Sequence, residues 1–380
     1  LLPTTPRIKG QVGRATRWTA KAYKGRVQVY AGDYAAALTT LREVRASGPY
    51  ALEPNFHQVW TGFQAFANGK ETILAYQASS NDGAPDGDNA NWGERLNFPH
   101  SGAPLGMGGC CGFHQPSQNL VNFFAVDAAG LPLALTNPNW NALDTNLAAP
   151  STVPVDPRLD WTVGRDRVPY KDWGPHLPGW IRQRAYGGPY SPKKNVHEKA
   201  SDAGSKVGWQ PTQLNSVNIH IYRYADLLLL LAEAEVEAGV LDNALAIVNE
   251  IRTRAGAAAQ GPGTSASDIA VPINDPSITW AVYRVGLYPA FPDQNYARTA
   301  VRYERRLELA MEGQRFFDLR RWGIADQVLN AYVTVEMLRR GYKSASAIFG
   351  DRHKLYPLPA VQIALSRVEG ENRLVQNPGW

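Results

Sequence analysis

Three glutamates, Glu304, Glu308 and Glu312, are spaced four residues apart and would form one stripe of carboxylates along a helix. Carboxylates can act as general acids and bases, and glycoside hydrolysis needs two of them facing each other at a set separation. Arg305 and Arg315 lie three residues from members of the stripe, so ion pairs along the helix account for it without any chemistry. The sequence marks no facing pair, and we predict that the protein is not an enzyme.

Two stretches contain residue types that bind metal ions. Residues of the types that bind zinc are His100, Cys110, Cys111 and His114. Adjacent cysteines chelate one tetrahedral ion poorly, so we expect no zinc. Oxygen ligands for Ca²⁺ occur at Asp82, Asp86 and Asp88. That segment lacks the EF-hand spacing and the terminal bidentate Glu, which favours a solvated turn. We therefore predict no metal and no cofactor, with Ca²⁺ at the three aspartates as the alternative.

Residues 91–113 form the main candidate for ligand binding. Sugars present CH-rich faces ringed by hydroxyls, so a sugar site needs an aromatic platform with convergent polar groups. This stretch offers both, at Asn91, Trp92, Arg95, Phe98, His100 and Phe113. A second group of candidates consists of Trp173, Trp180, Tyr186 and Tyr190. The alternative is that these loops pack against the rest of the chain and that the ligand binds elsewhere.

Tryptophans are concentrated in the same part of the chain, since six of the eleven lie between residues 78 and 213. Their spread through loops favours surface recognition, although long loops also need aromatic anchors. Neutral sugars give a charged side chain nothing to pair with. We therefore expect affinity to depend on stacking and to change little with salt.

Helix pairs are the elements that must position these loops. Residues 222–239 and 241–254 form two amphipathic runs, and five consecutive leucines in the first point all around a helix, which must then be covered on both sides. Small residues at the contact points and a turn at Gly239 fit a tetratricopeptide pair. Residues 13–46 predict a second pair, with Asp33 as a helix N-cap.

Between these pairs the chain is rich in Gly, Pro, Asn and Asp, with a short helix expected at 115–124 and short strands within 71–77 and 156–163. A third helical block, residues 301–323, is interrupted by Gly313. We therefore predict a mostly α fold, in which tetratricopeptide-like helical repeats carry a long, irregular, loop-rich ligand-binding region with few short strands.

Composition narrows the class of protein. The 380 residues are 44% hydrophobic and 19% charged, which is typical of a globular chain. The net charge of +5 is small for this length, so we expect no nucleic-acid partner. No apolar run approaches the ~20 residues needed to span a bilayer. Only two cysteines occur, which excludes a disulfide-stapled scaffold.

Several motifs together resemble the SusD/RagB family of outer-membrane nutrient-binding lipoproteins of Bacteroidota. The most specific is E-R-R-L-E-L-A-M-E-G-Q-R-F-F-D-L-R-R-W-G at 304–323. Three others are R-Y-A-D-L-L-L-L-L-A-E-A from Arg223, H-K-L-Y-P-L-P from His353 and Q-N-P-G-W from Gln376. Residues 13–52, 110–124 and 156–161 also look like the family, in the family's order. The N-terminal lipidated cysteine and an earlier helical region of the family are not present in this chain.

The resemblance implies a fold of four tetratricopeptide-like units in a single domain over residues 1–380. Its parts would be a helical repeat pair (1–52), the loop-rich binding region (53–220), a central repeat pair (221–256), a connection (257–297) and the C-terminal signature region (298–380). Part of the N-terminal region of the family fold would be missing.

The resemblance also implies a non-catalytic subunit of an uptake complex. Such a subunit faces outward on the outer membrane by a lipid anchor, captures an oligosaccharide and acts as a lid on a TonB-dependent SusC-like barrel. The alternative is a helical-repeat scaffold that binds protein or peptide. The oxidising location favours a vicinal disulfide between Cys110 and Cys111, and two reduced, buried thiols are the alternative.

Overall fold

The computed structural model describes the chain except residues 1, 7–9, 98–99, 101, 105, 108–110, 195, 209–212, 264, 266–267 and 342–347. It is mostly helical, with short strands, as predicted. Contacts divide it into two compact units, Leu1–Gly313 and Gln314–Trp380, and each is described by itself. The boundary falls inside the expected C-terminal region 298–380, and the single domain over residues 1–380 stays a prediction.

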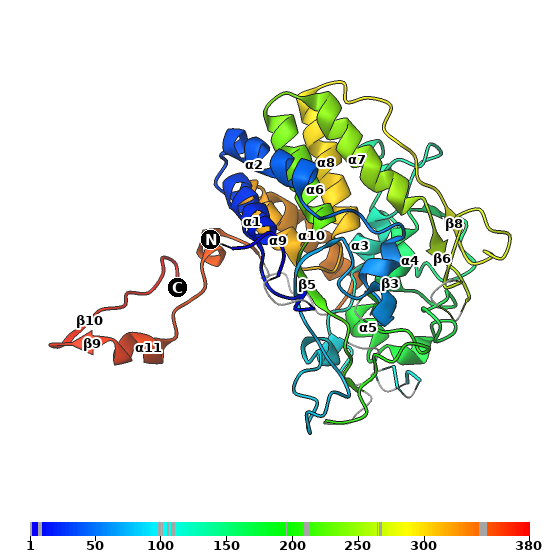
Figure 1. The fold of residues 1–380 in the computed structure, drawn as a ribbon, viewed down its shortest axis with the longest axis horizontal. Helices are drawn as coiled ribbons and strands as arrows, with labels where there is room; N and C mark the ends of the chain where they lie inside the picture. Colours follow the sequence, from blue (N-terminus) through cyan, green and yellow to red (C-terminus); the bar gives the residue numbers. More distant parts are fainter. Residues whose placement is uncertain are drawn as a thin grey trace. The chain divides into compact units, whose positions relative to one another are not determined.

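The first unit contains eight α-helices among its described residues (Figure 1). They are α1 (Arg17–Tyr30), α2 (Tyr34–Ser47), α3 (Gln118–Phe123), α4 (Arg158–Thr162), α5 (Arg184–Gly187), α6 (Tyr224–Glu237), α7 (Leu241–Ala255) and α8 (Gln294–Glu308). Its strands form four two-stranded pairs. Three are antiparallel: β1 (Thr72–Tyr76) with β5 (Ile219–Arg223), β3 (Val163–Gly164) with β4 (Ser191–Pro192), and β6 (Ala259–Gln260) with β7 (Ala270–Val271). β2 (Pro154–Val155) and β8 (Val282–Tyr283) pair in parallel.

Helix α6 lies at the centre of the helical core, where α1, α2, α7 and α8 all pack against it (Figure 1). All five leucines from Leu227 to Leu231 are buried, which confirms the prediction of an internal helix. The predicted repeat pairs α1/α2 and α6/α7 are both present. A Cβ on Gly25 would lie 2.3 Å from Leu41 Cδ2, so only glycine lets α1 and α2 approach this closely.

Local capping explains where the first helices begin. The carboxylate of Asp33 accepts a hydrogen bond of 3.1 Å from the backbone N–H of Ala36, so Asp33 is the N-cap of α2 as predicted. Ser117 caps α3 in the same way, two residues after the expected start. The strand expected within 156–163 is wrong, because α4 occupies most of that segment. Asp156 accepts from the backbone N–H of Arg158, which turns the chain into a helix, and only β3 follows as a short strand.

The second unit contains α9 (Gln314–Arg321), α10 (Ala325–Arg339), α11 (Ala360–Leu365) and the antiparallel pair β9 (Arg367–Val368) and β10 (Glu371–Asn372). Gly313 has a φ of +79° and separates α8 from α9, which confirms the predicted interruption. An apolar cavity of about 430 Å³ lies within this unit. Among the described residues of both units, no helix is long and apolar enough to cross a membrane.

Candidate functional site

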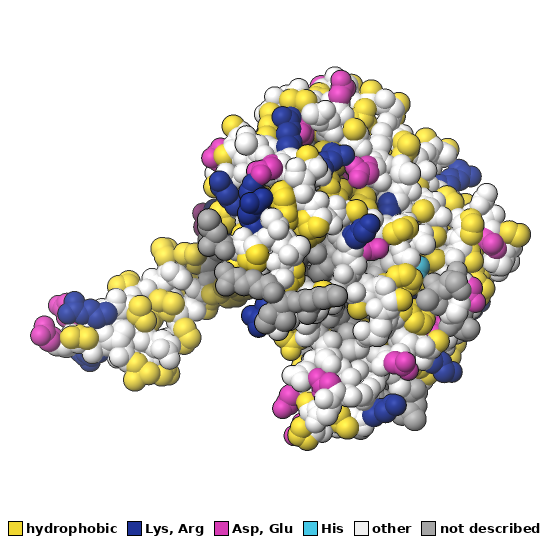
Figure 2. Space-filling model, in the orientation of Figure 1, with side chains coloured by type: hydrophobic (Ala, Val, Ile, Leu, Met, Phe, Trp, Pro, Cys, Tyr) yellow, Lys and Arg dark blue, Asp and Glu magenta, His cyan; other side chains and the backbone are white. Residues whose placement is uncertain are grey.

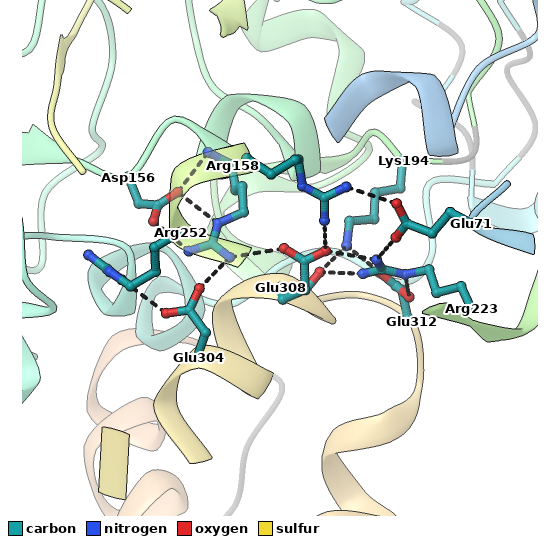
Figure 3. Close-up of polar contacts among 10 residues, drawn as sticks. Glu71, Asp156, Arg158, Lys194, Arg223, Arg252, Glu304, Glu308 and Glu312 are labelled. Atoms are coloured by element: carbon teal, nitrogen blue, oxygen red, sulfur yellow. Dashed lines mark hydrogen bonds and ion pairs between the residues drawn. The ribbon is translucent and has the colours of Figure 1, made fainter. Parts of the chain in front are cut away.

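A buried network of charged side chains ties the loop-rich region to the helical core (Figure 3). Its five cations are Arg158, Lys194, Arg223, Arg252 and Arg254. Its five anions are Glu71, Asp156, Glu304, Glu308 and Glu312. No side chain in the set is more than 4% exposed. The charges balance, as burial of so many ionised groups requires.

Arg223, the last residue of β5, makes the largest number of contacts in this network. Its Nη1 lies 2.6 Å from Glu71 Oε1 and 2.7 Å from Glu308 Oε1. Its Nε donates to Glu312 Oε2 at 2.8 Å, and its Nη2 donates to the backbone carbonyl of Glu308. One guanidinium thus joins the segment before β1 to the helical segment around α8.

Arg158 extends the network on the other side of Glu308. Its Nη1 lies 2.7 Å from Glu304 Oε1 and 2.9 Å from Glu308 Oε2, while its remaining nitrogens bind Asp156. Arg252 on α7 reaches Glu304 Oε2 at 2.9 Å. Each carboxylate of the predicted stripe is therefore held by cations.

The ion-pair interpretation of the glutamate stripe is right, but its partners are not those expected. Spacing along the helix predicted neighbours three residues away, whereas Glu308 binds Arg223 and Arg158, which lie 85 and 150 residues away in the sequence. Arg305 pairs with Asp226 of α6 at 2.8 Å. Burial would raise the pKa of Glu308, but the guanidinium groups of Arg254, Arg223 and Arg158 hold that pKa well below its usual range. A carboxylate held in this state cannot serve as a general acid.

A second buried arrangement, which the sequence did not reveal, joins Asp166, His176 and Ser191. His176 Nδ1 lies 3.0 Å from Asp166 Oδ1, and its Nε2 lies 2.7 Å from Ser191 Oγ. These residue types form nucleophilic triads in hydrolases. Here Ser191 and His176 are 0% exposed, so no substrate reaches the hydroxyl.

Asp166 also anchors α5. Arg184 Nη2 donates to Asp166 Oδ2 at 2.6 Å, and Asn146 donates to the same oxygen. Burial would raise the pKa of Asp166, but its hydrogen bonds with His176 and Arg184 hold that pKa well below the usual range. The arrangement holds the segment that contains α5 rather than acting on a substrate.

The described candidates of residues 91–113 divide into buried and exposed side chains. Asn91 is 0% exposed and donates to the Val217 carbonyl at 2.9 Å, so its role is to hold the loop. His100 is half-buried, and its backbone N–H donates to the Trp180 carbonyl. Trp92 and Phe113 are 37% and 54% exposed. Phe98 lies outside the described residues.

The second group of candidates divides in the same way. Trp180 and Tyr190 are buried, and the Tyr190 hydroxyl lies 3.2 Å from Gln118 Oε1. Trp173 is half-buried and donates its indole N–H to the His197 carbonyl at 2.8 Å. Tyr186 of α5 is 53% exposed. Most described tryptophans of the loop region therefore anchor loops, and Trp92 is the most exposed of them.

Two of the exposed candidates define what we call the Trp92–Phe113 surface, formed by Trp92, Arg95, Leu96, Phe113 and Arg182. The backbone N–H of Phe113 donates to the Leu96 carbonyl at 2.9 Å, which joins its two halves. Arg95 Cζ lies 5.9 Å from the centre of the Trp92 ring, and Arg182 Cζ lies 5.9 Å from the centre of the Phe113 ring. The sequence identified the rings but missed Arg182.

The metal and cysteine candidates are less informative. Asp82 accepts from the backbone of Ala84 and from Asn89, and the hydrogen bond from Asn89 is the main cause that lowers the pKa of Asp82. Among the described residues, no three His, Cys, Asp or Glu side chains gather where they could hold a metal ion. Cys111 is disulfide-bonded. Cys110 lies outside the described residues, and the vicinal disulfide stays a prediction.

Charged side chains on the face shown in Figure 2 are of both signs and are scattered among apolar ones. The larger unit is thus a helical-repeat core that carries irregular loops, with aromatic rings exposed at one part of them. These features place the protein in a class of helical-repeat proteins whose candidate binding surface is built from loops. A sequence model of the SusD family matches residues 70–380, and the chain belongs to this family.

Individual relatives agree with this assignment. SusD-like protein P38 of Formosa agariphila is 25% identical over 318 residues, which are 81% of this chain and 52% of P38. A laminarin-binding SusD-like protein has a TM-score of 0.60 at 23% identity, covering 100% of this chain and 66% of that one. Surface glycan-binding protein A from Bacteroides fluxus has a TM-score of 0.63 at 20% identity, with the same coverage. The chain thus spans about half the length of its curated relative.

Proposed function

We propose that this protein is a non-catalytic glycan-binding subunit of an outer-membrane nutrient uptake complex. It would face outward on the membrane by a lipid anchor and act as a lid for a TonB-dependent SusC-like barrel. Membership of the SusD family supports this role. Similar structures also support it, since they include a laminarin-binding SusD-like protein and a surface glycan-binding protein A in complex with laminarihexaose.

The observation that carries the proposal is the pair of exposed rings, Trp92 and Phe113, on loops that buried hydrogen bonds hold in place. Asn91 fixes the backbone beside Trp92, and the Trp92 indole N–H donates to the Gly87 carbonyl at 3.0 Å. A ring that is already held loses little conformational freedom when a sugar stacks on it. The surface is therefore preorganised for a flat, CH-rich ligand.

Isothermal titration of the purified chain against neutral and acidic oligosaccharides tests glycan binding. We expect saturable binding to at least one of them, and no release of reducing ends when the protein is incubated with the matching polysaccharide. Release that a single Asp or Glu substitution abolishes would show that the protein is an enzyme. Co-purification of a β-barrel partner from outer membranes with the lipidated protein tests the lid role separately.

Trp92→Ala is expected to weaken glycan binding by roughly 1–3 kcal/mol, because truncating a central contact removes its buried area. Trp380→Ala is the matched control, since Trp380 is 45% exposed but belongs to the second unit. Titration of both variants with the same glycan gives the comparison. Equal affinity of wild type and Trp92→Ala would remove Trp92 from the site.

Peptide binding is the second candidate function, and the cavity of the second unit favours it. The cavity is lined mainly by apolar and aromatic side chains: Phe316, Arg320, Leu329, Tyr332, Val333, Ile348, Phe349, His353, Lys354, Leu355, Tyr356, Pro357 and Trp380. Such a lining suits the apolar side chains of a peptide. Titration with apolar peptides, compared between wild type and Trp380→Ala, tests this function.

A further inference from the structure

Both exposed rings of the Trp92–Phe113 surface have an arginine over them. The distance of 5.9 Å from each guanidinium to its ring centre lies at the outer limit of a cation–π contact. At this distance the attraction is weak. Arg95 is also held by a hydrogen bond of 3.1 Å from its Nε to Gln213 Oε1, whereas the guanidinium of Arg182 can turn toward a ligand at little cost. Its donors would then form two parallel hydrogen bonds to a carboxylate or sulfate, a geometry that lysine does not offer.

Arg182 is exposed, and among the described side chains no carboxylate pairs with it. Neighbouring arginines differ in this respect, because Arg184 pairs with Asp166 and Arg165 pairs with Asp160. The backbone of Arg182 is nevertheless held in place. A Cβ on Gly112 would lie 3.4 Å from Arg182 Cβ, so the segment packs directly against the loop that carries Phe113.

Charge differs between the two halves of the surface. The Trp92 indole donates to Gly87, whose neighbours Asp86 and Asp88 are exposed. The two carboxylates of Asp86 and Asp88 outnumber the single positive charge of Arg95 beside Trp92, whereas Arg182 contributes positive charge beside Phe113. An anionic group on a ligand is attracted to the Phe113 half and repelled from the acidic loop.

We propose that the ligand of this surface is an anionic oligosaccharide, in which a carboxylate or sulfate group binds Arg182 while the sugar ring stacks on Phe113. The proposal rests on the proposed function and specifies its ligand class. It departs from the expectation of a neutral sugar bound by stacking alone, because only the folded structure shows that Arg182 lies over an exposed ring.

Titration of the full chain with three hexasaccharides tests the ligand class: laminarihexaose as the neutral probe, hexagalacturonate as the carboxylate probe, and a sulfated carrageenan hexasaccharide. We expect one anionic probe to bind at least tenfold more tightly than laminarihexaose at low salt. Its affinity should fall several-fold between about 50 and 500 mM NaCl, because salt screens exposed charges. The carboxylate and sulfate probes distinguish the two sources of charge.

Arg182→Gln should remove most of the preference for the anionic probe, with an affinity loss of about tenfold. Lys24→Gln on α1 is the control, since it removes the same charge from an exposed position of the helical repeats.

Laminarihexaose binding as tight as that of both anionic probes, with no salt effect, would overturn the ligand class and leave glycan binding intact. Equal losses in Arg182→Gln and Lys24→Gln would also contradict the proposal, since they would indicate a general effect of net charge. Absence of binding to all three probes would count against both this proposal and the proposed function.

Discussion

Arg223→Met is expected to lower the free energy of unfolding by about 3–5 kcal/mol, because it removes one partner from a buried ionic network. Arg223 contacts Glu71, Glu308 and Glu312, and its side chain is 1% exposed. Methionine fills part of the same volume but offers no donor. The carboxylates of Glu71, Glu308 and Glu312 would each lose one positively charged partner. Inside the protein, a buried charge without a partner is strongly unfavourable.

Arg45→Met is the matched control for this prediction. Arg45 pairs with Glu250 at 2.7 Å, but the two side chains are 36% and 39% exposed. Exposed ion pairs contribute about 0–1 kcal/mol, so this variant should unfold close to wild type. Urea unfolding of both variants gives the comparison.

A milder variant keeps the prediction testable where Arg223→Met does not fold. Glu312→Gln keeps the shape and removes one charge opposite Arg223 and Lys194. We expect a loss intermediate between those of Arg223→Met and Arg45→Met. Similar small losses in all three variants would mean that solvent reaches the network and that burial does not determine its strength.

Local patterns were enough to predict the helical core. Five consecutive leucines implied a helix covered on all sides, and α6 is such a helix. Asp33 was recognised as a cap because capping depends on residues within one turn. The prediction of a strand within 156–163 was wrong. The conformation of this segment depends on the hydrogen bond from the backbone N–H of Arg158 to Asp156 and on the ion pair between Arg158 and Glu308, which is far away in the sequence.

The candidate site was predicted only in part, because exposure depends on contacts between distant segments. The sequence indicated Trp180 and Tyr190 as candidate ligand contacts. In the structure Trp180 packs against Tyr170 and His176, and the Tyr190 hydroxyl hydrogen-bonds to Gln118. The sequence around Arg182 does not mark it as a candidate binding residue, because only the folded loops bring it over Phe113. The sequence shows which residues are aromatic, but only the folded structure shows which of their rings face solvent.

Stability is expected to fall steeply as the pH drops from about 6.5 to about 4, and His57 and His197 are the main cause. Burial lowers the pKa of each from the ordinary 6.5 to about 4. In this window the unfolded chain binds a proton at each histidine and the folded chain does not, so acid favours unfolding. A shift of this size corresponds to roughly 3 kcal/mol for each group. Burial also lowers the pKa of His176 and His220, which acts in the same direction.

His57→Phe separates the contribution of one histidine from the rest. His57 stacks on Trp161 at 5.0 Å, and among the described residues neither of its ring nitrogens has a hydrogen-bond partner. Phenylalanine keeps the stacked ring and removes two buried polar atoms, so stability at pH 7 should be unchanged or higher by about 1 kcal/mol. Because the variant cannot take up the proton, its loss of stability between pH 6.5 and 4 should be smaller than that of wild type by roughly 3 kcal/mol.

Urea unfolding at half-unit steps of pH measures both effects of His57→Phe. Parallel stability curves for wild type and variant would show that His57 takes up its proton equally in the folded and unfolded states. A variant that is less stable at pH 7 would show instead that the ring nitrogens are hydrogen-bonded to buried water in the folded protein. Below about pH 4.5 the curves should become steeper for both proteins, because the pKa values of Glu308 and Glu312 are lowered in the folded state and their ion pairs are lost on protonation.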